Sequence, residues 1–128
     1  MGGTKAKLSV TILAGNPETN RELNSYFREA GIASQATGAI WCDARMVAKS
    51  SNAVVIFPDE FGVDDVVTSV MSLRHSRPKL LVLLITATPQ RFREALAPDG
   101  RSLPPIVLSK PAFGWTILDV IRAHTDTV

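Results

Sequence analysis

Four polar residues stand near the ends of predicted strands in this sequence. Thr86 closes one apolar segment, and Lys110 closely follows another. Asp59 and Glu60 come directly after a third. Because open α/β sheets bind ligands at the carboxyl ends of their strands, these residues could line a small-ligand site, with Lys110 holding a phosphate group. We favour plainer roles, in which Lys110 bonds to a loop carbonyl or an acid and the two acids occupy a solvated turn, since a displacement of two residues points a side chain elsewhere.

Five segments of strand length must position these residues. Four of them are rich in apolar and β-branched residues and cover 8–14, 53–57, 80–86 and 106–108. The fifth, over 32–37, is polar enough that we expect it at an edge of the sheet. Segments with a helical spacing of apolar residues alternate with them, over 17–30, 39–49, 63–73, 91–96 and from Phe113 or Gly114 onward. This alternation predicts right-handed βαβ units, and therefore a parallel sheet with helices on both faces.

The first predicted helix carries clear signals at both ends. Asn16 is a good N-cap, and Pro17 fits the first helical position, where its missing N–H costs nothing. Gly31 supplies a stop after the last turn. We therefore expect this helix to follow the first strand after a very short loop.

The bulk composition predicts one globular domain. The chain has 128 residues, of which 45% are hydrophobic and 20% are charged, and its net charge is +2. We expect a single domain over residues 1–128, with flexible ends at 1–6 and 125–128. The small charge argues against nucleic acid, and no apolar run is long enough to span a bilayer. Cys42 is the only cysteine, and no signal peptide is visible, so we expect a cytoplasmic protein.

The sequence carries no motif for a metal or a cofactor. Neither His75 nor His124 has a cysteine, histidine or carboxylate at ligand spacing, so we expect no metal site. Glycine-rich nucleotide-binding motifs and the serine nucleophile motif are missing too, so no cofactor is expected. We therefore do not expect an enzyme.

Several segments together resemble the receiver domain of bacterial response regulators, the CheY-like family. They read ILAGNPETNREL, NAVVIFPDEFG, LLITA and VLSKP, and they keep the family's order and spacing along nearly the whole chain. The resemblance implies a flavodoxin-like, CheY-like, doubly wound α/β fold. Its parallel sheet would have five strands in the order 2-1-3-4-5, and five helices would cover it.

The resemblance assigns the family's phosphorylation pocket to positions that keep only half of its pattern. Thr86 matches the switch hydroxyl, and Lys110 matches the lysine that reads the phosphate. The acidic pair falls on Gly15 and Asn16, and the phospho-accepting aspartate falls on Phe57. Phosphoryl transfer to a carboxylate needs a nucleophilic oxygen and a cation such as Mg²⁺, and these last three residues supply neither the nucleophile nor carboxylate ligands. The sequence therefore predicts a degenerate pseudo-receiver.

Two functions from different classes remain. The leading one is a phosphorylation-independent protein-interaction module in a bacterial signalling pathway, which binds a protein partner or a second copy of the chain. The alternative is a small-ligand-binding or enzymatic domain that uses Thr86, Lys110, Asp59 and Glu60 at the strand ends. Phe57 filling the pocket would favour the first, and an open cleft with convergent polar groups the second. A role for Asp59 or Glu60 as a substitute acceptor or metal ligand also stays open.

The resemblance places the partner-binding face around the last two predicted helices. Exposed aromatic residues bordered by arginine are frequent anchors of protein interfaces. Trp115 could equally cap the core beside Pro111, and Val107 replaces the aromatic residue that rotates on activation in the family. The residues of the candidate face are Arg91, Phe92, Arg93, Val107, Phe113 and Trp115.

Overall fold

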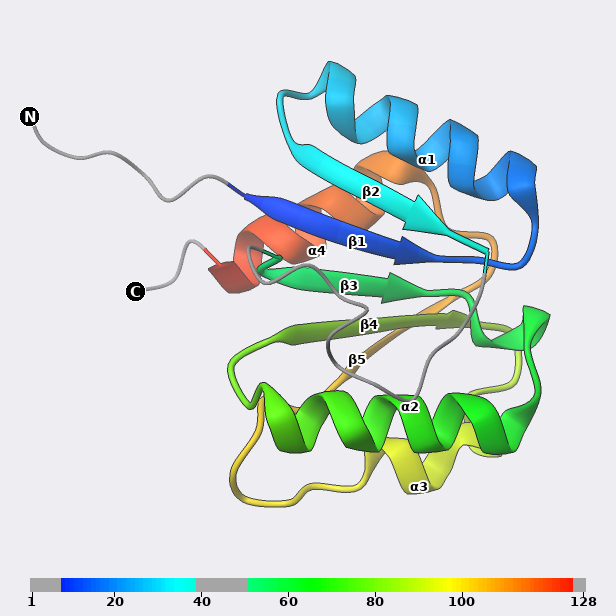
Figure 1. Ribbon diagram of the computed structural model, residues 1–128, viewed down its shortest axis with the longest axis vertical. Helices are drawn as coiled ribbons and strands as arrows, with labels where there is room; N and C mark the ends of the chain where they lie inside the picture. The colour runs from blue at the N-terminus through cyan, green and yellow to red at the C-terminus, as the bar shows by residue number, and fades with distance from the viewer. Residues whose placement is uncertain (1–7, 39–50, 126–128) are drawn as a thin grey trace, which may run out of the picture.

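The computed structural model describes residues 8–38 and 51–125, which form a five-stranded parallel sheet with helices on both faces (Figure 1). The sheet order is β2-β1-β3-β4-β5, so the predicted order 2-1-3-4-5 is confirmed. The half-exposed β2 lies at one edge, as its polar sequence predicts. The strands are β1 (Ser9–Leu13), β2 (Ala33–Thr37), β3 (Ala53–Ile56), β4 (Leu81–Thr86) and β5 (Ile106–Ser109).

Two layers of helices enclose the sheet. Helix α1 (Pro17–Glu29) contacts α4 (Gly114–Thr125) on one face, and α2 (Val63–Ser76) contacts α3 (Arg93–Leu96) on the other (Figure 1). The described residues thus contain four α-helices rather than five. The helix predicted over 39–49, together with Cys42, lies outside the described residues.

The helix predicted over 91–96 is only partly α-helical. It begins as the 3-10 helix η3 (Pro89–Phe92), with proline in its first turn, and only the single turn α3 is α-helical. Another 3-10 helix, η2 (Pro58–Glu60), follows β3 and also opens on a proline. Short tight turns of this kind suit the connections at strand ends.

The core is double because each central strand is buried on both faces. Successive side chains of a strand point to opposite faces. On β3, Ala53 and Val55 join the apolar cluster beneath α1 and α4, whereas Val54 and Ile56 join the cluster beneath α2 and α3. An unbroken apolar run is therefore what this strand requires, as the sequence predicts.

The predicted ends of α1 are confirmed. Asn16 accepts a hydrogen bond from the backbone N–H of Glu18 at 2.9 Å through its side-chain oxygen, and Pro17 is the first helical residue. After the helix, Gly31 adopts a φ of +80°, which glycine tolerates better than residues with a β-carbon.

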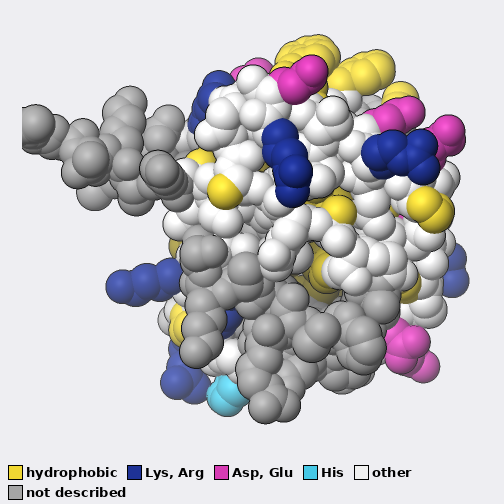
Figure 2. Space-filling view, turned by 45° about the horizontal axis from the view of Figure 1, so that its top comes forward, with side chains coloured by type: hydrophobic (Ala, Val, Ile, Leu, Met, Phe, Trp, Pro, Cys, Tyr) yellow, Lys and Arg dark blue, Asp and Glu magenta, His cyan; other side chains and the backbone are white. Residues whose placement is uncertain are grey.

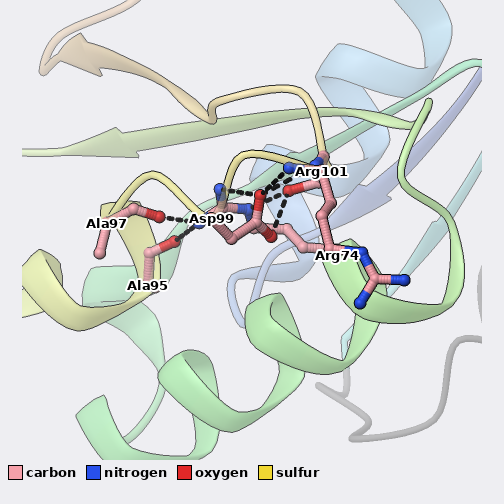
Figure 3. Close-up of polar contacts among 6 residues, drawn as sticks. Arg74, Ala95, Ala97, Asp99 and Arg101 are labelled. Atoms are coloured by element: carbon pink, nitrogen blue, oxygen red, sulfur yellow. Dashed lines mark hydrogen bonds and ion pairs between the residues drawn. The ribbon is translucent and has the colours of Figure 1, made fainter.

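A buried arginine attaches α3 and the following loop to α2. Arg74 lies in the basic last turn of α2, and its side chain is buried. It donates hydrogen bonds to the carbonyl oxygens of Ala95 and Ala97 and to the hydroxyl of Ser102 (Figure 3). Its remaining nitrogen lies 3.5 Å from the carboxylate of Asp99. The guanidinium can be buried because the loop before β5 folds back over the end of α2 and supplies these acceptors.

The loop before β5 also stabilises the charged form of Asp99, an acid within the loop. The backbone N–H groups of Ser102 and Arg101 and the hydroxyl of Ser102 donate to the carboxylate of Asp99. These bonds, with a smaller contribution from Arg74, hold the pKa of Asp99 well below its ordinary value.

Within residues 8–38 and 51–125, no helix combines the length and the apolar character needed to cross a membrane.

Candidate functional site

The register of the sheet brings the candidate residues to one edge. Ile56 pairs with Leu13 and with Leu84, and Thr86 pairs with Ser109, so four strands end at nearly the same level. Because the strands are parallel, the segments that follow them meet above this edge. The candidate residues Gly15, Asn16, Asp59, Glu60, Thr86 and Lys110 all lie in or next to these segments.

Asp59 forms the centre of a polar cluster at this edge. Its Oδ1 accepts hydrogen bonds from the hydroxyls of Thr86 at 2.5 Å and Thr88 at 3.3 Å. Its Oδ2 accepts from the backbone N–H of Ala87 at 2.9 Å and lies 3.5 Å from Lys110 Nζ. The expectation that Lys110 bonds to an acid is confirmed. The expectation that Asp59 sits in a solvated turn is wrong.

The side chain of Asp59 points toward Thr86 because of the turn that follows β3. The backbone N–H of Glu60 donates to the carbonyl of Phe57 at 3.2 Å, and that of Phe61 donates to Pro58 at 3.1 Å. The chain therefore curls into η2 as soon as the strand ends, and η2 contacts β4. If the alternation of the strand continued through Asp59, the side chain would point elsewhere, but the curl turns it back over Thr86.

The bonds to Asp59 set its charge. Partial burial raises the pKa of its carboxyl, but the hydrogen bonds from Thr86 and Ala87 and the charge of Lys110 together outweigh burial. The pKa of Asp59 therefore lies below its ordinary value. A carboxyl group whose pKa is lowered by folding adds stability above the unfolded-state pKa and loses it as the pH falls through the folded-state value.

We expect Asp59→Asn to lower the free energy of unfolding at neutral pH by about 1 kcal/mol, because the amide is uncharged and lacks the second acceptor oxygen. The difference from the unmodified protein should shrink as the pH falls below about 4, where the unfolded carboxyl also protonates. Urea unfolding at a series of pH values measures both effects. Asp119→Asn, on the exposed surface of α4, is the control and should change little. A pH-independent difference between Asp59→Asn and the unmodified protein would show that the carboxylate bonds contribute nothing.

Glu60 bonds to the loop after β1 rather than to solvent alone. Its Oε1 accepts a hydrogen bond from the backbone N–H of Asn16 at 2.8 Å. A β-carbon added to Gly15 would lie 3.2 Å from both the β-carbon and the carbonyl oxygen of Glu60. The glycine therefore leaves room for Glu60 to approach, and the solvated-turn prediction fails for this acid as well.

Phe57 turns away from the polar cluster and into the core. Its side chain is 8% exposed and belongs to the apolar cluster that includes Leu23, Phe27 and Ile117 from α1 and α4. Phe57 therefore fills the space at the strand ends only on the side of these two helices. On the other side, Asp59 occupies the space in front of Thr86.

Beside Phe57 lies an open hollow of about 500 Å³ between α1 and the loop that leads into α4. Its mouth adjoins two large exposed aromatic residues, Phe113 at 58% and Trp115 at 59%. Their rings are stacked, with centroids 6.3 Å apart and planes 1° from parallel. The hollow is lined by Thr19, Glu22, Leu23, Tyr26, Phe57, Glu60, Lys110, Pro111, Ala112, Phe113, Gly114 and Ile117.

Comparison with solved structures identifies the architecture. A signal receiver domain of an HD domain-containing protein from Pseudomonas fluorescens Pf-5 matches with a TM-score of 0.70 at 13% identity, covering 98% of this chain and 92% of that one. This protein has the receiver fold. A response regulator receiver protein from Sinorhizobium medicae WSM419 matches at 0.68 and 15% identity, covering 94% and 96%. Neither a family model nor a curated protein matches the chain.

The similar structures also include a protein whose name refers to pilus assembly. A protein assigned to pilus assembly from Burkholderia thailandensis E264 matches with a TM-score of 0.67 at 14% identity, covering 94% of this chain and 99% of that one. At identities this low, the matches establish a shared fold. In most of these structures, the domain with that fold is a signalling module. Function has to be argued from the side chains of this chain.

The side chains at this edge of the receiver fold do not suit Mg²⁺. Magnesium needs near-octahedral oxygen ligands, usually with carboxylates among them. Asp59 already bonds to Lys110 and three other donors, and Glu60 bonds to the backbone of Asn16. In the described part of the chain, no three His, Cys, Asp or Glu side chains form a group that could hold a metal ion.

The structure divides the predicted partner face of the receiver fold. Phe92 is buried at 1% exposure in the cluster beneath α2 and α3, so its predicted exposure is wrong. Arg91 and Arg93 are exposed, but they belong to η3 and α3, on the face of the sheet opposite α4. The arginines therefore do not border the aromatic residues of α4, as they were expected to.

What remains of that face is the exposed pair formed by Phe113 and Trp115. Trp115 does not cap the core, since more than half of its side-chain surface is exposed. Val107 is half-buried on the edge strand β5. The two stacked rings are the exposed aromatic residues of the predicted face.

Sequence reasoning missed one wall of the hollow. Thr19, Glu22, Leu23 and Tyr26 are spaced as i, i+3, i+4 and i+7, so they share one side of α1. The helical pattern alone could have grouped them, but not shown which loop they face. Thr88 was missed as well, although it lies only two positions after Thr86 in the loop that follows β4.

Proposed function

We propose that this chain is a pseudo-receiver, a module that binds a protein partner without being phosphorylated. The observation that carries the proposal is the position of Asp59. Its carboxylate already bonds to Thr86 and Lys110, the two residues that match the phosphate-reading groups of receivers. An internal anion therefore takes the place that a phosphoryl group would have to enter.

The bonding of Asp59 also argues against Asp59 as a substitute phospho-acceptor. Each of its oxygens has two donors: Thr86 and Thr88 at Oδ1, and Ala87 N–H and Lys110 at Oδ2. Attack on a phosphoryl donor would break these bonds. It would also need the same donors to stabilise the charge on the incoming group. Phe57, at the acceptor position itself, offers a buried ring with no nucleophile.

A fixed anion has a consequence for signalling. A domain switches when a ligand or modification favours one of two conformations over the other. Here the donors that would sense phosphorylation are bonded in the unmodified protein, so the binding face has a single state. We infer an adaptor role, without enzymatic activity, in a bacterial cytoplasmic signalling pathway, with a protein partner or a second copy as the bound molecule.

The alternative function as a small-ligand or enzymatic domain uses Thr86, Lys110, Asp59 and Glu60. Three of these side chains bond to one another, and Glu60 bonds to the loop after β1. The four groups therefore do not converge on one open cleft, since only Glu60 and Lys110 among them line the hollow beside Phe57, and this favours the interaction module.

The test is treatment with acetyl phosphate or phosphoramidate in the presence of Mg²⁺, followed by intact-protein mass measurement. We expect no phosphate adduct, whereas a receiver domain with an intact acceptor and acidic pair, treated in parallel, should gain one. An adduct that is lost in Asp59→Asn or Glu60→Gln would contradict the proposal and make that acid a substitute acceptor. Binding of the partner should be equal with and without the phosphodonor.

A further inference from the structure

We infer that the hollow between α1 and α4 binds a basic segment of the partner protein, with a cationic side chain entering the hollow and the rest of the segment covering Phe113 and Trp115. The inference rests on the proposed function, since it names the chemistry of the partner. It is carried by the charges and rings that line the hollow.

The charge at the hollow is negative although the whole chain is positive. The charged residues that line it are Glu22, Glu60 and Lys110. Lys110 Nζ lies 3.5 Å from the carboxylate of Asp59, and the two groups form an ion pair whose charges offset each other. The two glutamates remain to attract a cation. On the face viewed in Figure 2, acidic side chains lie close to apolar ones at the upper edge, and Lys or Arg side chains stand near them.

The walls of the hollow are aromatic. Tyr26, Phe57 and Phe113 contribute rings from α1, the end of β3 and the loop before α4. Aromatic faces attract ammonium and guanidinium groups, and the attraction increases when the cation is partly desolvated. Acids beside aromatic rings therefore favour an arginine or lysine side chain over an anion or a purely apolar group.

Gly114 allows the start of α4 to pack closely against the ring of Tyr26. A β-carbon at this position would lie 2.9 Å from the ring of Tyr26, closer than a side chain can approach. The backbone at the start of α4 and the tyrosine ring are thus in direct contact, which closes one side of the hollow.

The exposed aromatic pair shows why the bound group should be larger than a small amine. Trp115 stacks on Phe113 outside the hollow and does not line it. A free amine could occupy the hollow, but it would leave both rings in water. Large exposed apolar side chains next to each other are typical of interaction surfaces. A peptide segment covers the hollow and the rings together.

Selection from a library of displayed random peptides tests the inference, with the complete chain as the bait. We expect the enriched peptides to carry arginine or lysine next to a large apolar residue. Titration with a selected peptide, synthesised in free form, should show about tenfold weaker binding to the double variant Glu22→Gln, Glu60→Gln, and the loss should be greater at low salt than at high salt. Glu29→Gln, an exposed acid near the other end of α1, is the matched control and should bind normally.

Three results would overturn the inference. Enrichment of acidic or uncharged peptides would do so, as would equal binding of the basic peptides by the double variant. Binding of agmatine, a free guanidinium amine, as tightly as the peptides would make the hollow a small-amine site instead. None of these results would touch the proposed function, which fails only on phosphorylation of the chain or on its failure to bind a protein partner.

Discussion

Replacing Phe57 by aspartate is expected to lower the free energy of unfolding by roughly 4 kcal/mol. The ring is buried in the apolar cluster beneath α1 and α4, so its loss leaves a cavity. The new carboxylate would also need a cation. Lys110, the lysine at this edge of the sheet, already pairs with Asp59. Urea unfolding of both proteins at neutral pH measures the difference.

Two further substitutions separate the cavity from the charge. Phe57→Leu keeps an apolar side chain of similar volume and should cost roughly 1 kcal/mol. Phe57→Asn should be more stable than Phe57→Asp at neutral pH, because burial without a partner raises the pKa of the aspartate carboxyl. Destabilisation by a raised pKa decreases as the pH falls and the group protonates, so the two polar variants should converge in acid. Equal urea midpoints for Phe57→Asp and the unmodified protein would mean that the ring is not buried.

Replacing Trp115 by alanine is expected to remove most of the binding to the partner. The indole is 59% exposed and stacks on Phe113, so it contributes little to the core and much to the exposed apolar surface. Truncating an aromatic anchor at an interface typically costs about 2–4 kcal/mol, which is about 30-fold to 1,000-fold in affinity. The partner would be identified by affinity capture from the native cell with mass spectrometry, and its affinity for each variant measured by calorimetry.

Met71→Ala supplies the matched control for this substitution. Met71 is also a large exposed apolar residue, at 51%, but it lies on α2, on the opposite face of the sheet. This variant should bind the partner normally, and both variants should keep the circular dichroism spectrum of the unmodified protein. Normal binding by Trp115→Ala together with a loss in Thr86→Ala would place the interaction at the polar cluster, and the aromatic surface would then be the wrong one.

The elements of this fold could be predicted from sequence because they depend on local patterns. The run from Ala53 to Ile56 is apolar at every position, which only a strand buried on both faces requires. Asn16, Pro17 and Gly31 each act within one or two turns of their own helix, so the ends of α1 were predicted correctly. The resemblance to receivers then supplied the sheet order, which the structure confirms.

The site depended on contacts between distant segments, and these the sequence did not determine. Asp59 and Thr86 are 27 positions apart, and they meet because Pro58 and its neighbours form a 3-10 turn instead of extending the strand. The chain forms this turn because η2 packs against β4 and because hydrogen-bond donors lie beside it. The periodicity of apolar residues in the sequence encodes neither of these contacts.

Burial of single side chains followed the same division. The sequence correctly assigned Phe57 no chemistry, because a phenyl ring has no nucleophile wherever it points. It misplaced Phe92, because the burial of this ring depends on how α3 folds against α2. Residue types thus excluded phosphoryl transfer at Phe57 from the sequence alone. Only the tertiary structure decided that the carboxylate of Asp59 bonds to Thr86 and Lys110, because hydrogen bonds form between neighbours in space.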